Sequence, residues 1–167
     1  MKGFRSVGAV LAAALALSAC LAADDPPAAV SPVTSVEIVV DGWQDLEGSA
    51  TGYWNAILAA ELTAGEGAGS RIVIQEGIPS TMTAREHRDR RVLELEGRGI
   101  EAVAIGERMI DAAPAAGLRY RQVNRTSETW YTVKGGLRYV IHLESEEGAR
   151  EMSPRARDVL AHLQIRR

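Results

Sequence analysis

The 167-residue sequence has few of the residues that cross-link a small protein or fill its core with large rings. It contains one cysteine, Cys20, and one phenylalanine, and only 5% of its residues are aromatic. A single cysteine excludes an internal disulfide, whatever the redox state of the compartment. Lysine is nearly absent as well. Lys2 and Lys134 are the only two, so arginine carries almost all of the positive charge.

The sequence also lacks an excess of positive charge and a long apolar run. Removing Lys2 and Arg5, which open the chain, from the 19 basic residues leaves 17 against 22 acidic ones, a net charge of −5. Nucleic-acid-binding domains usually carry a basic face, so this balance argues against a nucleic-acid partner. The apolar run from Val7 to Leu17 is shorter than the roughly 20 residues that a membrane-spanning helix needs.

The N-terminus instead predicts export. A basic start followed by an apolar run of this length is typical of a secretory signal peptide. The run ends in LSAC (residues 17–20), which resembles the bacterial lipobox, a leucine and two small residues before a cysteine. The resemblance implies cleavage before Cys20 and acylation of its thiol, and two or more acyl chains hold a protein firmly at a membrane. The alternative is an ordinary signal peptide cut after Ala23, with a chance cysteine.

Three parts are therefore predicted: a lipoprotein signal peptide (1–19), a lipidated N-terminus with a flexible tether (20–33), and a single domain (34–167). Residues 24–33, DDPPAAVSPV, contain three prolines. Such stretches are extended and semi-rigid and have no face to bury. The remainder suits one domain, since domains most often have about 100–150 residues.

Local patterns predict the first half of this domain. Strands are expected at 34–40, at 53–62 and 71–76 as a hairpin, and at 100–110 with an interruption at Gly106. Residues 53–62 also fit a helical stripe, and the glycine-rich turn that follows favours the strand. Thr83 and Glu86 have capping-box spacing, so they predict the start of a charged helix that ends at Gly97. Val92 and Leu95 are its expected contacts with the core.

The second half is expected to form a three-stranded meander and a closing helix. The stretch DAAPAAG (111–117) is expected to break the chain, and strands are predicted at 118–124, 129–133 and 137–143. Gly135-Gly136 suits the last tight turn. Ser153-Pro154 predicts a helix start, with Ala156, Val159, Leu160 and Leu163 on its buried face. The predicted fold class is α+β, an antiparallel β-sheet flanked by two helices.

The order of elements and several phrases resemble the PsbP-like fold, and more narrowly the DcrB-like and mycobacterial LpqN-type lipoproteins. The phrases are DGW after the first strand, IPSTMTAREHRDRRVLELEG, GLRYRQVN and ETWYTVKGGLRYVIHLES. Gly117, Gly136 and Tyr139 would occupy the family's meander, while the link IGERMIDAAPAAG departs from it. The resemblance implies a non-catalytic domain that binds partners or small apolar ligands, or supports envelope assembly.

The usual signatures of catalysis are weak or missing. GEGAGS (65–70) is followed by a strand, has no adjacent lysine and contains Glu66, so a hairpin turn is favoured over a phosphate-binding loop. The histidines, His87, His142 and His162, are too far apart in sequence to indicate a zinc site. No Gly-x-Ser-x-Gly motif is present. No catalytic residue, metal ligand or cofactor is predicted.

The few aromatic residues are the candidates for recognition. Trp43, Trp54 and Tyr131 are predicted to contact a ligand or partner, because rings bind partners well where they line a groove. The alternative is that the aromatic residues fill the core. This alternative is least favoured for Trp43, which is expected in a loop.

The predicted protein is a lipid-anchored module of the cell envelope that faces outward and binds an envelope protein or an apolar ligand without catalysing a reaction. Its contact with the membrane would be the lipid on Cys20. Two alternatives remain: an envelope hydrolase, which a pocket with a perturbed histidine or paired acids would favour, and a chaperone or adaptor for a secreted protein.

Overall fold

The computed structural model describes residues 35–46 and 55–166. Its strands are β1 (Ser35–Ile38), β2 (Trp43–Asp45), β3 (Ala56–Leu62), β4 (Arg71–Pro79), β5 (Ala102–Ile110), β6 (Ala113–Gln122), β7 (Arg125–Lys134), β8 (Leu137–Glu144) and β9 (Leu163–Arg166). Its helices are α1 (Ala84–Glu96), α2 (Pro154–Asp158) and the 3₁₀ turn η1 (Val159–Ala161).

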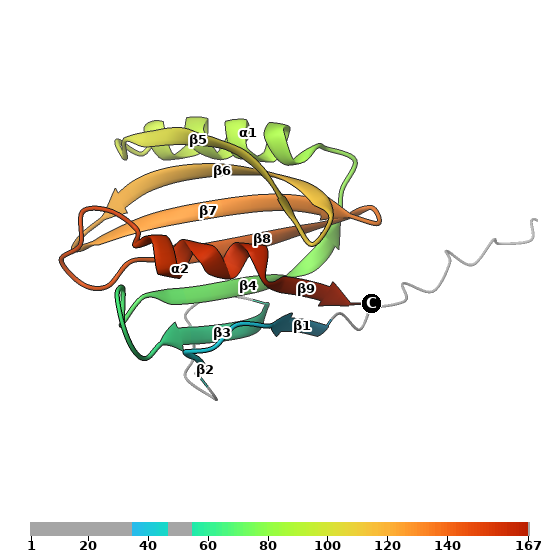
Figure 1. Ribbon diagram of the computed structural model, residues 1–167. Helices are drawn as coiled ribbons and strands as arrows, with labels where there is room; N and C mark the ends of the chain where they lie inside the picture. Colours follow the sequence, from blue (N-terminus) through green and yellow to red (C-terminus); the bar gives the residue numbers. More distant parts are fainter. Residues whose placement is uncertain (1–34, 47–54, 167) are drawn as a thin grey trace, which may run out of the picture. The chain divides into compact units, whose positions relative to one another are not determined.

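Seven of these strands form one antiparallel sheet in the order β2-β3-β4-β8-β7-β6-β5, and β1 pairs with β9 as a separate two-stranded ribbon (Figure 1). The predicted class, an α+β domain with an antiparallel sheet and two helices, is confirmed. The predicted hairpin is β3–β4, and Gly135-Gly136 joins β7 to β8. The interruption expected at Gly106 is a β-bulge in β5, where the φ of Gly106 is +106°.

Both faces of the sheet are apolar because both are covered. Along β7 and β8, consecutive side chains point to opposite faces. Trp130 and Ile141 belong to a cluster with α2 and η1, whereas Tyr131 and Val140 belong to a cluster with α1. The helix α1 packs on the β5–β6–β7 side of the sheet, so each face has its own helix (Figure 1).

The helix α1 begins with the predicted capping box. The Thr83 amide donates to Glu86 Oε2 at 2.7 Å, and the Glu86 amide donates to Thr83 Oγ1 at 3.2 Å. The hydrogen bond from the Thr83 backbone holds the pKa of the Glu86 carboxyl below its usual value. Leu95 is buried and Val92 half-buried, as expected, and Ala84 and His87 also face the sheet.

The expected break at 111–117 is wrong. Only Asp111 and Ala112 turn, with φ values of 47° and 59°, and β6 begins at Ala113. Positive φ at both residues is what a two-residue hairpin turn of type I′ requires. Pro114 lacks an amide hydrogen, but its carbonyl still accepts a hydrogen bond from Thr132 Oγ1 at 3.1 Å. The next turn also comes earlier than predicted, before Arg125.

Two predictions at the ends of the domain are also corrected. The first strand stops at Ile38, and Trp43, which was expected in a loop, lies in β2. The closing helix starts with Ser153 as its cap, as predicted, but it ends at Asp158 and leads through η1 into β9. Leu163 is therefore buried on a strand, because pairing with Ile38 of β1 replaces the last helical turn.

Gly117 allows Trp130 to lie flat on the neighbouring strand. The two residues are paired across β6 and β7, and a Cβ on Gly117 would come 2.8 Å from three indole carbons. We expect Gly117→Ala to lower the free energy of unfolding by about 1–3 kcal/mol, the usual effect of overpacking a core. Urea denaturation measures this change.

Gly97→Ala is the matched control. Gly97 follows α1 with a φ of −60°, and its added Cβ would meet two backbone carbonyls of that helix, Leu93 at 3.3 Å and Glu94 at 3.7 Å. We expect a change within about 0.5 kcal/mol, as for most surface substitutions. An equal loss in both variants would contradict the packing argument.

Candidate functional site

A buried carboxylate on β7 organises one face of the sheet. The Glu128 side chain is fully buried, and its Oε1 accepts hydrogen bonds from Arg157 Nη2 of α2 at 2.8 Å and from Arg119 Nη2 of β6 at 3.1 Å. The indole nitrogen of Trp130 lies 3.4 Å from the other carboxylate oxygen. Buried charges are retained only when they are paired in this way. Glu128 therefore connects two strands and the closing helix.

A cavity of about 270 Å³ adjoins Arg119. We call it the arginine pocket; it is lined by Glu101, Val103, Ile105, Arg119, Tyr120, Arg121, Thr126 and Arg150. These residues come from β5, β6, β7 and the segment that leads into α2. The pocket therefore lies at one end of the sheet, where β5 begins, β6 ends and β7 begins.

The charge of the arginine pocket is unbalanced. Arg119 shares the single carboxylate of Glu128 with Arg157. Arg121 and Arg150 are exposed, and neither forms an ion pair with another residue in the described part of the chain. Among the described residues that line the pocket, Glu101 is the only acidic one. The site therefore has a surplus of positive charge and suits an anion.

The pocket also has an apolar side. Val103 is 55% exposed, and Ile105 is half-buried against the core. Arg150 is fixed at the opposite side through its backbone, because Thr126 Oγ1 lies 2.8 Å from the Arg150 carbonyl and 3.3 Å from the Ala149 carbonyl. The arrangement combines guanidinium groups with an exposed aliphatic surface.

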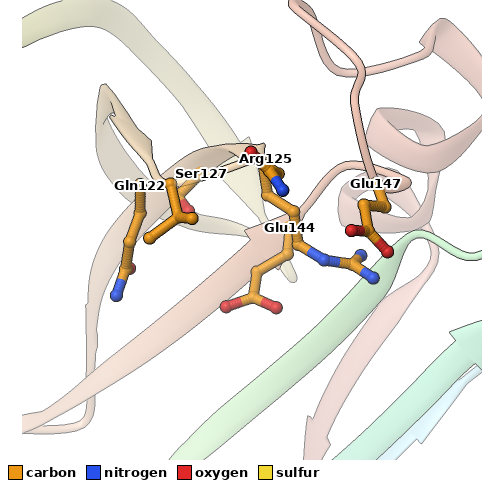
Figure 2. Close-up of a pocket in the computed structure, with 7 residues that line it drawn as sticks. Gln122, Arg125, Ser127, Glu144 and Glu147 are labelled. Atoms are coloured by element: carbon orange, nitrogen blue, oxygen red, sulfur yellow. The ribbon is translucent and has the colours of Figure 1, made fainter.

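A second cavity, of about 320 Å³, lies beside it at the β6–β7 turn. It is lined by Gln122, Val123, Asn124, Arg125, Ser127, Glu144 and Glu147. Arg125 Nη1 donates to the carbonyls of Ser145 at 2.6 Å and Gly69 at 3.0 Å. Figure 2 shows the Arg125 side chain extending towards Glu147, whereas Gln122 and Glu144 project to the other side. Its arginine is thus already used to hold two loops together.

A serine–histidine pair lies on the opposite face, at the start of α1. Ser80 Oγ is 2.7 Å from His87 Nε2, and the same oxygen accepts a hydrogen bond from the Met82 amide at 3.1 Å. His87 is 8% exposed and stacks on Tyr131 with ring centroids 5.9 Å apart. Burial lowers the pKa of His87, and the charges of Arg138 and Arg90 add to this effect, so the ring is neutral near pH 7.

Two of the predicted recognition residues, Trp43 and Tyr131, are not brought together. Trp43 is half-buried on β2 and packs against the cluster that contains α2, whereas Tyr131 is 6% exposed in the cluster that contains α1. Burial raises the pKa of Tyr131 to about 12. Trp54 and Cys20 lie outside the described residues. A ligand-binding role for Trp43, Trp54 and Tyr131 stays a prediction.

The residues that line the arginine pocket were not singled out from the sequence. The signal for two of them was present, because Arg119 and Arg121 are two positions apart on a strand and therefore share a face. Arg150 had no such signal, because a loop carries it to the site.

Within residues 35–46 and 55–166, no three His, Cys, Asp or Glu side chains are grouped closely enough to hold a metal ion. No helix there has the length and apolarity to cross a membrane.

Comparison with protein-family models finds no match, and comparison with curated proteins finds no significant match. The resemblance to PsbP-like and DcrB-like lipoproteins therefore stays a prediction.

The role of Glu128 can be measured directly. We expect Glu128→Gln to lower the free energy of unfolding by about 2–4 kcal/mol. A neutral amide cannot balance the charges of Arg119 and Arg157, and its NH₂ group would face their N–H donors. This range is below that of a fully buried pair, because the two arginine side chains are 37% and 32% exposed. Urea denaturation is the measurement.

Glu107→Gln provides the comparison. Glu107 pairs with Arg85 at the surface, where both side chains are about half exposed. Such pairs contribute about 0–1 kcal/mol. If both variants lost equally little stability, Glu128 would not be the link between the sheet and α2.

Proposed function

We propose that this chain is a lipid-anchored, extracytoplasmic binding protein, attached to the membrane through Cys20 and carried on residues 20–33. Its domain recognises a ligand or partner of the cell envelope and does not catalyse a reaction. The observation that carries the proposal is the position of the two cavities, which lie at the end of the sheet opposite to β1, where the chain enters the domain.

Four contacts define the end of the sheet at which β1 lies. Ser35 pairs with Arg166 of β9. The amide of Ile165 donates to Asp111 Oδ2 at 2.7 Å, and Lys134 Nζ bonds both Asp111 and the Ile165 carbonyl. Asp111 lies in the β5–β6 turn and Lys134 at the end of β7, so β9 and its partner β1 lie at that end (Figure 1).

The two cavities lie at the other end of the same strands. Gln122 and Arg121 close β6, and Arg125 opens β7. At about 3.3 Å per residue, the ten residues of β6 separate the two ends by roughly 30 Å. A tether attached at β1 would thus leave the arginine pocket on the far side of the domain, where ligands can reach it.

The anchor is tested by expressing the full chain in a bacterial host, wild type beside Cys20→Ala. We expect the wild type to lose residues 1–19, to gain the mass of its acyl groups and to partition with membranes, because two or more acyl chains give lasting attachment. Cys20→Ala should show no lipid mass and should leave the membrane fraction. Intact mass spectrometry and fractionation give both readings.

The double variant Cys20→Ala/Ala29→Cys keeps one thiol but moves it out of the LSAC sequence. It should behave as Cys20→Ala does. Membrane attachment of this double variant, or a soluble wild type with a free thiol, would overturn the lipid anchor.

One observation favours a second function, that of a hydrolase: the hydrogen bond between Ser80 and His87. A nucleophile needs an adjacent base, and that base needs a third group to orient it. Within the described part of the chain, no side chain bonds His87 Nδ1, and Ser80 Oγ is already an acceptor for Met82. These contacts favour a structural role for the pair.

We therefore expect a fluorophosphonate probe to leave Ser80 unlabelled, and Ser80→Ala to lower stability by about 1 kcal/mol, the typical contribution of one hydrogen bond. Thr81→Ala, at an exposed neighbouring position, is the control and should change neither reading. Labelling of Ser80 that disappears in His87→Gln would instead support the hydrolase.

A further inference from the structure

We propose that the arginine pocket binds a small organic anion, a carboxylate or phosphate that carries an apolar group, and that Arg121 and Arg150 recognise its charge. This inference rests on the binding role proposed above and names the chemical class of ligand. Four features support it: the positive charge of the lining residues, the available guanidinium donors, the exposed aliphatic surface, and the attachment of the loop that carries Arg150.

The positive charge is local and does not reflect the chain as a whole. The whole sequence has a net charge of −3. Around the pocket, Arg119 and Arg157 outnumber Glu128 by one, and Arg121 and Arg150 add two further charges against Glu101. Clefts lined by one sign of charge concentrate ligands of the opposite sign. The pocket is therefore cationic in an acidic protein.

The guanidinium groups still have donors to offer. Arginine has five N–H donors in a planar fork that matches carboxylate and phosphate oxygens. Arg119 uses Nε and Nη2 for Glu128, at 3.3 and 3.1 Å, and Nη1 makes no hydrogen bond with another described residue. Glu128 thus holds Arg119 in place at the pocket, while Arg121 and Arg150 supply charges that have no ion-pair partner among residues 35–46 and 55–166.

The apolar side selects among anions. Val103 is 55% exposed, although it lies directly across from Arg119 in the β5–β6 pairing. An aliphatic group on the ligand would cover this surface and add apolar burial, which free phosphate cannot do. The volume of about 270 Å³ lies just below the usual range of about 300–1,000 Å³ for ligand pockets, so the ligand is small.

Arg150 is placed by contacts that do not depend on a ligand. Thr126 Oγ1 binds the carbonyls of Ala149 and Arg150, and the Gly148 amide donates to the Asn124 carbonyl at 2.7 Å. The loop that carries Arg150 is therefore attached to the β6–β7 hairpin. The backbone that carries the exposed Arg150 side chain is thus ordered before a ligand binds, which lowers the entropy cost of binding.

The test uses the purified full chain with Cys20→Ser, so that binding is read independently of the anchor. Hexanoate, hexyl phosphate, inorganic phosphate and hexanol are titrated, and backbone amide shifts are followed by NMR. We expect saturable binding of hexanoate and hexyl phosphate with shifts at residues 101–105, 119–126 and 148–151. Inorganic phosphate should bind more weakly, and hexanol should not bind. Added salt should weaken the binding of each anion, because it screens the charges.

Single substitutions then identify the side chains that recognise the charge of the ligand. Arg121→Gln and Arg150→Gln should each weaken hexyl phosphate binding about tenfold, the effect of losing one charge-assisted hydrogen bond. Glu101→Gln should strengthen binding, because it removes the opposing charge. Arg90→Gln removes the same charge from α1, where Arg90 is 71% exposed and pairs with Glu94, and it should leave binding unchanged.

Each of the following results would overturn the proposal. Equal weakening by Arg90→Gln and Arg121→Gln would indicate a general effect of net charge. If inorganic phosphate bound as tightly as hexyl phosphate, the apolar group would contribute nothing to the affinity. If hexanol bound as tightly as hexanoate, the negative charge would contribute nothing. If hexanoate, hexyl phosphate and inorganic phosphate all failed to bind, the anion site would be disproved, but the lipid anchor would not, because the Cys20→Ala experiment tests the anchor without a ligand.

Discussion

The structure depends on the neutralisation of Glu128 in the middle of the sheet. A fully buried carboxylate is unfavourable unless donors surround it, and here they come from Arg119 on β6 and Arg157 on α2. The short closing helix has only five residues, and the ion pair adds a polar attachment to the apolar contacts of Ala156. One residue therefore fixes both the position of α2 and the direction of the Arg119 side chain.

The same arrangement accounts for the charge at the arginine pocket. One carboxylate cannot neutralise two guanidinium groups, so the stabilising contact leaves an excess positive charge beside the cavity. Because Arg119 is paired, it is held rigidly; because Arg121 and Arg150 have no ion-pair partner among the described residues, they keep their donors available. A contact that stabilises the fold thus also prepares the proposed anion site, and the Glu128→Gln variant would disturb both.

The sequence predicted the elements whose signals are local. The capping box at Thr83, the Gly135-Gly136 turn and the alternation along β8 each act within a few residues. The errors arise where the local signal is missing or the partner lies far away in the chain. β6 begins at Ala113 because Asp111 and Ala112 form a tight turn without a glycine and so pair Ala113 with Ile110. Leu163 joins a strand because the distant β1 is its partner. The site follows the same rule. Arg119 and Arg121 share a face that the spacing alone reveals, whereas Arg150 reaches the pocket only through the contacts of Thr126.

The two ends of the sheet are held by separate polar interactions, which matters for the proposed attachment through residues 20–33. β1 pairs only with β9, and β9 is attached to the large sheet through Asp111 and Lys134. The pocket end depends instead on Glu128 and Thr126. A pull at Ser35 would first load the β1–β9 ribbon and its attachment, and among the described residues these share no hydrogen bond with the residues that line the pocket. The two ends are nevertheless coupled through apolar packing, because Val36 and Ile38 of β1 and Ile105 of the pocket pack against the same core cluster. The proposed anchor and the proposed recognition site therefore have separate polar contacts but share one core.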